Sequence, residues 1–332
     1  MSNAVNEQIH QKLQAAKRIL VVSHIRPDGD AVGSLLGLGL ALQSAGKDVQ
    51  MVSAEGVPAS FRHLPGSQEV RNHPEGTFDL IVVLDCGEMK RIGYVLDGST
   101  PPDINIDHHI TNQYYAEVNL VDTIAVATAE ILAENLAFWG FQLSQPVATA
   151  LMNGLITDTL GFRTSNMTSK AMRVAADLME RGVDMPELYA KALVHRSFEA
   201  VRFWGFGLTH LEREGPIVWA TLTQADRKAA GYPGRDDADM VNLLSTINDA
   251  AITLIFVEQP EDKVKISWRA QPGFDVSQVA LHFGGGGHPA AAGAEITGHL
   301  EEVRSSVLSA TRKLLKNNQH VIDHKPNMKD GI

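Results

Sequence analysis

The sequence has little of several things that would define a class of protein. It contains one cysteine, Cys86, in 332 residues, which excludes an intramolecular disulfide framework. It has no apolar stretch near the roughly 20 residues that a membrane helix needs, and its start does not resemble a secretory signal. Basic residues are outnumbered, 29 against 39 acidic, giving a net charge of -10. We therefore expect a soluble, cytoplasmic protein that does not coat long nucleic acid by bulk charge. The net charge does not exclude a local basic pocket.

The order of short apolar runs indicates the fold class. Runs typical of strands in parallel sheets occur at residues 19–22, 48–53, 78–84, 104–106 and 117–121. Helical patterns alternate with these runs or follow them, at residues 31–45, 126–138 and 146–160. This order predicts an α/β fold with a doubly wound, mostly parallel sheet. Ligands of such sheets gather at the carboxyl ends of the strands.

The length predicts more than one domain, because a chain of this size usually outgrows a single core. Strand patterns at 217–222, 251–258 and 263–269 indicate a second, smaller α/β domain, preceded by a helical stretch. We expect four parts: a metal-binding catalytic domain, a helical connector, a substrate-binding domain and a disordered tail, at residues 1–185, 186–210, 211–316 and 317–332.

The most informative stretch follows the first apolar run. His24, Asp28 and Asp30 lie within seven residues, in a loop that Pro27 stiffens and Gly29 makes adaptable. One imidazole and two carboxylates without a thiolate suit manganese, magnesium or iron better than structural zinc. Taken alone, the same stretch is also compatible with an ordinary polar loop between a strand and a helix.

Three further segments place ligand-type residues after apolar runs. Asp85 follows the third run, where a turn or helix cap is its ordinary use. The fourth run ends in Asp107, His108 and His109, which can supply a ligand, a substrate contact and an orienting carboxylate. Asp158 lies in an apolar context that demands a partner for its charge. A shared metal site explains these segments better than four unrelated structural roles.

A glycine run near the C-terminus is a candidate anion site. Gly285, Gly286 and Gly287 precede His288, and their backbone N–H groups could form an anion-binding nest. Arg269, on an expected strand, could bind the same phosphate. A flexible linker and an exposed strand arginine are the structural alternatives.

Together these motifs resemble the DHH phosphoesterases. The resemblance rests on His24-x-x-x-Asp28-x-Asp30, Asp85, Asp107-His108-His109 and Asp158, and on the glycine-rich signature of the DHH-associated C-terminal subdomain. It covers about residues 15 to 315.

The resemblance implies a site with two metal ions, Mn²⁺ by family habit and Mg²⁺ as the alternative. One ion would be held by His24, Asp28 and Asp85, and the other by Asp30, Asp85, His108 and Asp158. Asp85 would bridge the ions, His109 would touch the scissile phosphate or its leaving oxygen, and Asp107 would orient the histidine pair. Arg269, the glycines and His288 would bind substrate.

Within the family, the compact chain looks most like members that hydrolyse short oligoribonucleotides and 3′-phosphoadenosine-5′-phosphate. A phosphodiesterase for cyclic or linear dinucleotides, a single-strand exonuclease and a non-catalytic nucleotide-binding regulator are the alternatives. The expected partners are short RNA or a nucleotide bisphosphate, without long duplex nucleic acid or a membrane. The resemblance also allows a homodimer.

Overall fold

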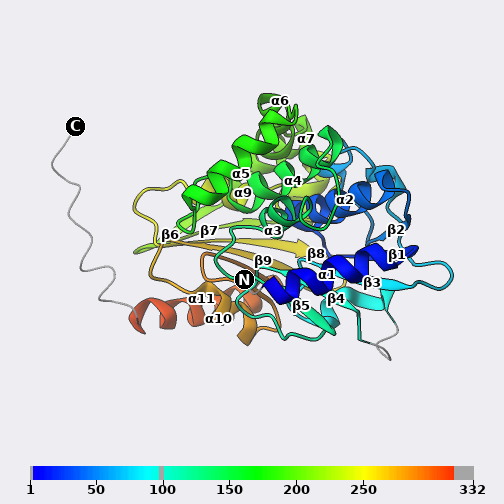
Figure 1. The fold of residues 1–332 in the computed structure, drawn as a ribbon. Coiled ribbons are helices and arrows are strands. Elements are labelled where there is room, and N and C mark those ends of the chain that lie inside the picture. The colour runs from blue at the N-terminus through cyan, green and yellow to red at the C-terminus, as the bar shows by residue number, and fades with distance from the viewer. Residues whose placement is uncertain (1–2, 97–100, 318–332) are drawn as a thin grey trace. The chain divides into compact units, whose positions relative to one another are not determined.

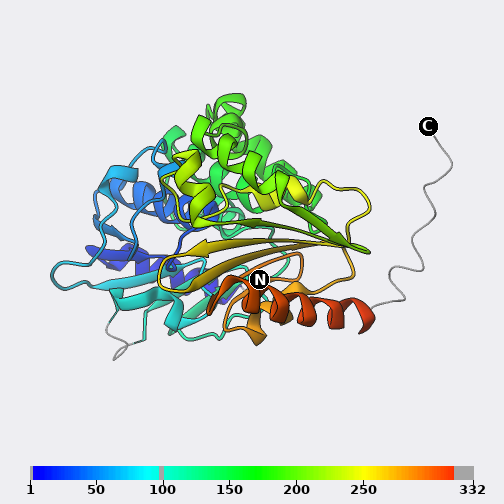
Figure 2. The same ribbon diagram turned by 180° about the vertical axis from the view of Figure 1, so that it is seen from behind.

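The computed structural model describes residues 3–96 and 101–317 and divides into two compact units, one up to His195 and one from Arg196 onward. Each unit contains one β-sheet. In Figures 1 and 2 the first unit is coloured from blue to green and the second from green to red. The predicted α/β fold class, with a parallel sheet and a second sheet domain, is confirmed. The stretch expected as a connector, 186–210, lies on both sides of the division. Apart from Asn317, the expected tail lies outside the described residues.

The first unit is built on five parallel strands in the order β2-β1-β3-β4-β5. Their bounds are β1 Arg18–Val22, β2 Asp48–Val52, β3 Leu80–Leu84, β4 Ile104–Asp107 and β5 Val118–Val121. After β1 the chain crosses to β2 on one side and returns to β3 on the other. This reversal makes the carboxyl ends of β1 and β3 a topological switch point, where α/β sheets bind ligands.

Helices cover one face of this sheet, and a shorter segment covers the other. The helices are α1 Asn3–Ala15, α2 Gly29–Ser44, α3 Thr128–Asn135, α4 Gln145–Asp158, α5 Ser169–Glu180 and α6 Met185–Tyr189, followed by a π-helical turn, Ala190–Val194. Val21 and Val82 face the core that these helices share. Val22 and Val83 face a smaller core with the 3₁₀ segment Met89–Val95; further 3₁₀ turns are Ala59–Phe61 and Ser67–Glu69. The alternation follows from the two-residue period of a strand.

Small residues bring α2 and α4 unusually close. A Cβ atom added at Gly33 would lie 2.5 Å from the Ala150 carbonyl oxygen and 2.7 Å from the Gly154 nitrogen. A Cβ at Gly154 would lie 2.6 Å from Oδ1 of Asp30. Because only glycine fits at these contacts, α4 can approach the first turn of α2, where Asp30 lies.

The second unit has a six-stranded mixed sheet in the order β10-β11-β9-β8-β7-β6. In this sheet β7 and β8 pair in parallel, and the other neighbouring strands pair antiparallel. The strands are β6 Leu211–Glu214, β7 Ile217–Leu222, β8 Ile252–Gln259, β9 Lys263–Ala270, β10 Gly286–His288 and β11 Ala291–Thr297.

Helices cover both faces of this second sheet. They are α7 Phe198–Thr209, α8 Gln224–Ala230, α9 Met240–Leu244, α10 Val276–His282 and α11 Leu300–Asn317. Trp268 lies in the core with α10 and α11, whereas Phe203 lies in the core of the opposite face with α8 and α9. Within residues 3–96 and 101–317, every helix is too short or too polar to span a bilayer.

Candidate functional site

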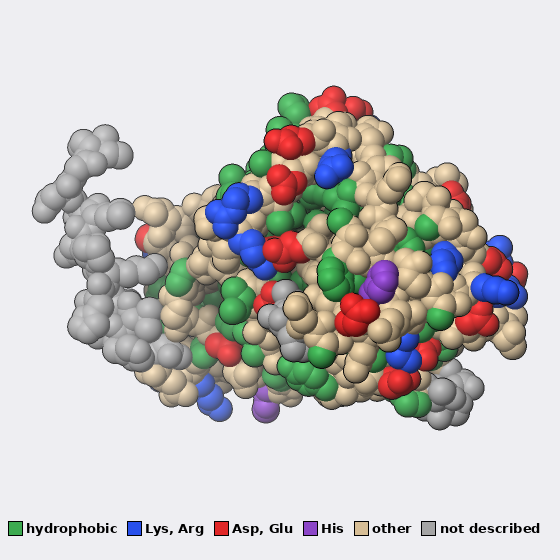
Figure 3. Space-filling model, viewed as in Figure 1, with side chains coloured by type: hydrophobic (Ala, Val, Ile, Leu, Met, Phe, Trp, Pro, Cys, Tyr) green, Lys and Arg blue, Asp and Glu red, His purple; other side chains and the backbone are tan. Residues whose placement is uncertain are grey.

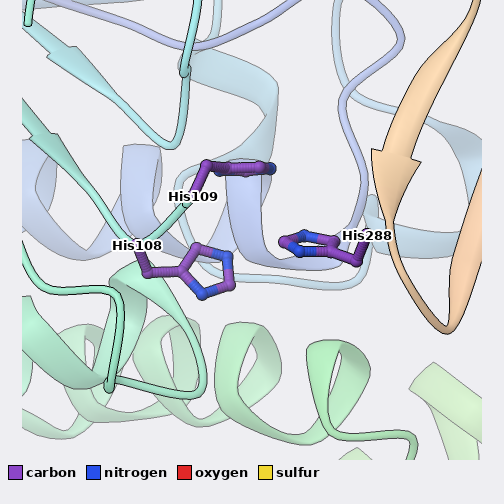
Figure 4. Close-up of side chains that lie close together, drawn as sticks. All are labelled: His108, His109 and His288. Carbon is purple, nitrogen blue, oxygen red and sulfur yellow. The ribbon is translucent and has the colours of Figure 1, made fainter. Parts of the chain in front are cut away.

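The chemistry-bearing side chains of the first unit gather at the carboxyl edge of its sheet. His24 follows β1, Asp85 follows β3, and Asp107 is the last residue of β4. Because all the strands are parallel, these ends lie along the same edge. His108 and His109 extend from the loop after β4, as Figure 4 shows. Asp158 reaches the group as the last residue of α4.

His24, Asp28 and Asp85 form one potential metal-binding group. Nε2 of His24 lies 3.9 Å from Oδ2 of Asp28 and 3.7 Å from Oδ2 of Asp85. The other oxygen of Asp28 caps α2 by accepting the N–H groups of Asp30 and Ala31. This cap fixes the carboxylate beside the histidine while leaving its second oxygen available.

Two contacts of Nδ1 favour opposite tautomers of His24. Nδ1 lies 2.8 Å from the Ile25 carbonyl oxygen, which requires a proton on Nδ1, and 3.3 Å from the Arg91 guanidinium, which requires a lone pair. We favour the shorter contact with Ile25. A neutral ring protonated on Nδ1 leaves a lone pair on Nε2, the atom that faces the two carboxylates.

Asp30, Asp85 and His108 form a second potential metal-binding group. Nε2 of His108 lies 4.0 Å from Oδ2 of Asp30 and 3.7 Å from Oδ1 of Asp85. The same nitrogen lies 3.5 Å from Oδ2 of Asp158. Nδ1 of His108 lies 3.3 Å from the Ala125 carbonyl oxygen, so its Nε2 can carry the lone pair as well.

Asp85 belongs to both groups and presents a different oxygen to each. Oδ2 faces His24, whereas Oδ1 faces His108. Asp85 has a φ of 54°, in the left-handed region where aspartate is better tolerated than bulkier residues. This backbone conformation directs the carboxylate between the two groups.

His109 is oriented by Asp107. Nδ1 of His109 lies 2.7 Å from Oδ1 of Asp107, which also accepts the backbone N–H of His108. Nδ2 of Asn112 donates to the second oxygen of Asp107 at 2.5 Å. Asp107 therefore fixes the ring of one histidine and the backbone of the other.

Burial and neighbouring charges shift the pKa values of the carboxylates in the site. Burial, together with the neighbouring charges of Asp85 and Asp158, raises the pKa of Asp30 well above its ordinary value. Burial likewise raises the pKa of Asp158 to about 6, against the opposing effect of His108. Burial works against ionisation of Asp85, but the neighbouring His24, His109 and His108 hold the pKa of Asp85 far below its ordinary value.

Neighbouring carboxylates raise the pKa values of His108 and His109. Burial alone would lower the pKa of His108, but Asp158 and Asp85 raise it above the ordinary value. The pKa of His109 is raised against burial by its bond to Asp107. Buried carboxylates that repel one another are stabilised by a cation. The donor set of carboxylate oxygens and imidazole nitrogens fits a hard or borderline divalent metal.

Several supporting residues escaped the sequence analysis. Backbone N–H groups of Thr128 and Ala129 donate to Asp30 at 2.6 and 3.0 Å, and Oγ1 of Thr128 donates to Asp85 at 3.0 Å. Asn112 supports Asp107. The expected helix start near residue 126 was the available signal, because the first N–H groups of a helix seek an acceptor.

The residues expected to bind substrate lie in the second unit. Arg269 is on β9, where its Nε donates to Oδ1 of Asn242 at 3.0 Å. Gly286, Gly287 and His288 form the edge strand β10, and His288, labelled in Figure 4, ends it. A Cβ at Gly285 would lie 2.8 Å from Cα of Ala294. A Cβ at Gly287 would lie 2.6 Å from Cα of Ala292. Close packing against β11 therefore accounts for two glycines of the run, and an anion nest stays a prediction.

Comparison with known proteins identifies the family. The model of the DHH family N-terminal domain matches residues 18–155, and that of the DHHA1 domain matches residues 223–317. A bifunctional oligoribonuclease and PAP phosphatase NrnA from Thermus thermophilus is 34% identical over 305 residues, 90% of each chain. The chain belongs to the DHH family. The resemblance stated from the sequence is thereby confirmed.

Other relatives agree with this membership. The NrnA protein of Bacillus subtilis is 26% identical over 84% of this chain and 89% of its own. The crystal structure of an exopolyphosphatase-related protein from Bacteroides fragilis has a TM-score of 0.84, with 23% identity over 97% of this chain and 98% of its own, and shares the fold. This DHH protein is a hydrolase acting on phosphoester bonds. Its family is metal-dependent, and its acidic and histidine groups could hold a metal.

Proposed function

We propose that this DHH hydrolase uses two divalent metal ions, Mn²⁺ by preference and Mg²⁺ as the alternative, to cleave short oligoribonucleotides and 3′-phosphoadenosine-5′-phosphate. The observation that carries the proposal is the position of Asp85, whose two oxygens face different groups of ligand-type side chains. A carboxylate shared in this way suits a bridge between two cations. The names of the relatives support the choice of substrates.

The proposed ligands follow the two groups. His24, Asp28 and Asp85 would hold one ion, as the distances from Nε2 of His24 favour. The second ion would be held by the residues around Nε2 of His108, namely Asp30, Asp85, His108 and Asp158. When bound, such a pair of ions neutralises the anionic substrate and makes a bound water more acidic.

His109 and Asp107 supply the protein's own acid–base chemistry. Asp107 accepts a hydrogen bond from Nδ1 of His109 and fixes the direction of the ring. The raised pKa of His109 favours its protonated form, which can donate a proton to the leaving oxygen. In this role His109 touches the substrate, and Asp107 keeps the imidazole in the productive orientation.

Arg269, Gly285, Gly286, Gly287 and His288 are the proposed substrate-binding residues. A guanidinium suits a phosphate because its donors form a planar fork, and Asn242 already restrains that of Arg269. On the face that Figure 3 shows, lysine and arginine side chains stand among aspartates and glutamates. Together with a net charge of -10, this distribution favours a substrate of few phosphates. A cytoplasmic location and a homodimer stay predictions of the sequence.

Substrate length tests the proposal. We would measure hydrolysis of 5′-labelled RNA of two, three, five, ten and twenty-four residues with Mn²⁺, at two salt concentrations, beside 3′-phosphoadenosine-5′-phosphate. Efficiency should peak at about two to four nucleotides or on the bisphosphate, with a salt dependence that reflects only a few phosphates. Equal efficiency on the longest RNA would favour a single-strand exonuclease instead.

A further inference from the structure

Residues 125–129 contact side chains of the two potential metal-binding groups. This segment, which leads into α3, makes four contacts with three of the proposed ligands. The Ala125 carbonyl faces Nδ1 of His108, two backbone N–H groups donate to Asp30, and the Thr128 hydroxyl donates to Asp85. A shift of this one segment would therefore disturb all three ligands together.

Glu130 ties this segment to α3. It lies in the first turn of the helix and is 0% exposed. Its Oε2 accepts the backbone N–H of Val126 at 2.7 Å. The helix has no side-chain cap from its own N-cap residue, Ala127. Glu130 thus fixes the segment at its centre, between the residues that contact His108 and Asp30.

Lys170 compensates the buried charge of Glu130. Its Nζ lies 3.3 Å from Oε1 of Glu130, 2.9 Å from Oε2 of Glu134 and 3.7 Å from Oδ2 of Asp122. Oε1 of Glu130 has no hydrogen-bond partner among the described residues, so its ion pair with Lys170 matters. Lys170 lies in the first turn of α5, where the helix dipole disfavours a cation. The carboxylates around it explain why a lysine is placed there.

We infer that Glu130, neutralised by Lys170, is a positioning residue for the metal centre. It fixes residues 125–129, and through them Asp30, Asp85 and His108, in the geometry that binds the ions. Neither Glu130 nor Lys170 belongs to the proposed ligand set. The inference rests on the proposed function, because it presupposes that these three ligands hold metal.

Metal affinity is the readout that separates positioning from a purely structural role. We would titrate the metal-free full chain with Mn²⁺ by calorimetry at a temperature where circular dichroism shows each variant folded. Glu130→Ala removes the acceptor for Val126 and should weaken Mn²⁺ binding about 10- to 100-fold, the usual cost of losing a group that orients metal ligands. Glu130→Gln keeps an acceptor and should recover part of this loss.

Lys170→Met supplies a second perturbation without touching the segment. It leaves the charge of Glu130 uncompensated and should weaken Mn²⁺ binding about tenfold. Glu134→Gln is the matched control: it removes a carboxylate from the same lysine, and Glu134 contacts Lys170 rather than residues 125–129. We expect its Mn²⁺ affinity to stay within about twofold of the wild type, like that of other surface changes.

The outcomes separate the inference from the function on which it rests. Wild-type Mn²⁺ affinity in folded Glu130→Ala would overturn the positioning role. Should that variant not fold, wild-type affinity in both Glu130→Gln and Lys170→Met would overturn it. A wild-type chain that binds no Mn²⁺ would overturn the proposed metal centre itself.

Discussion

The carboxyl edge of the first sheet and the glycine-rich edge of the second are built in different ways. At the first edge, Asp30, Asp85 and His108 are buried, and each is held by a group from another segment of the chain. At the second, β10 is a three-residue edge strand with two glycines. Side chains therefore form the first region, whereas backbone and a few side chains form the second. We expect changes in the first to affect metal and turnover, and changes in the second to affect substrate affinity.

Asp85→Asn should have the largest effect. Asparagine keeps the shape and tolerates the left-handed backbone at this position, but it removes the charge shared by the two groups. We expect kcat/KM on a diribonucleotide to fall on the order of 10³-fold or more. Asp28→Asn should do less harm, because Asp28 belongs to one group and its side chain is 60% exposed. We would measure metal content by mass spectrometry. Retention of both ions in Asp85→Asn would contradict the bridge.

His109→Ala should come next and should separate turnover from metal binding within the first region. Loss of a proton donor lowers kcat by about 10²-fold or more. Metal content should stay close to that of the wild type, because His109 is not among the proposed ligands. Metal analysis and steady-state kinetics on the same preparation make the test. A loss of metal would make His109 a ligand.

Arg269→Gln and His288→Ala should have moderate effects, on substrate affinity rather than on turnover. Each removes a proposed phosphate contact in the second unit, so KM should rise about tenfold while kcat changes little. Steady-state kinetics on the diribonucleotide would measure both parameters. A fall in kcat without a change in KM would contradict the division of labour between the two regions.

The glycine run should give the smallest effects and decide what the glycines do. A Cβ at Gly286 meets nothing within 4 Å, so Gly286→Ala should change the free energy of unfolding by no more than about 0.5 kcal/mol. Gly285→Ala meets the backbone of β11 and should cost about 1–3 kcal/mol. Denaturant unfolding would compare the two. If the run binds phosphate, Gly286→Ala should also raise KM a few-fold; an unchanged KM would reduce the run to packing.

The same contrast explains what could be predicted from sequence. The parallel strands were visible because their apolar runs are continuous, and parallel pairing then brings Asp85 and Asp107 to one edge. β10 and β11 were missed because glycine and alanine carry little strand signal. β6 was missed because all four of its residues are exposed and three are charged.

The supporting contacts of the site were the hardest to predict. Ala125 and Ala129 act through their backbone, so their residue type carries no chemical signal. The contacts of Thr128 with Asp30 and Asp85 join residues 98 and 43 positions apart. Such pairings depend on how α3 approaches the sheet, which local patterns do not specify.

The central claim is a metal centre that holds two ions through a shared Asp85. Its most direct test is titration of the metal-free protein with Mn²⁺, counting bound ions per chain while following hydrolysis of a diribonucleotide in the same samples. The account predicts two ions per chain, hydrolysis that is lost on chelation, and better recovery with Mn²⁺ than with the larger Ca²⁺. Full hydrolysis by the metal-free protein, or saturation at one ion per chain, would contradict it.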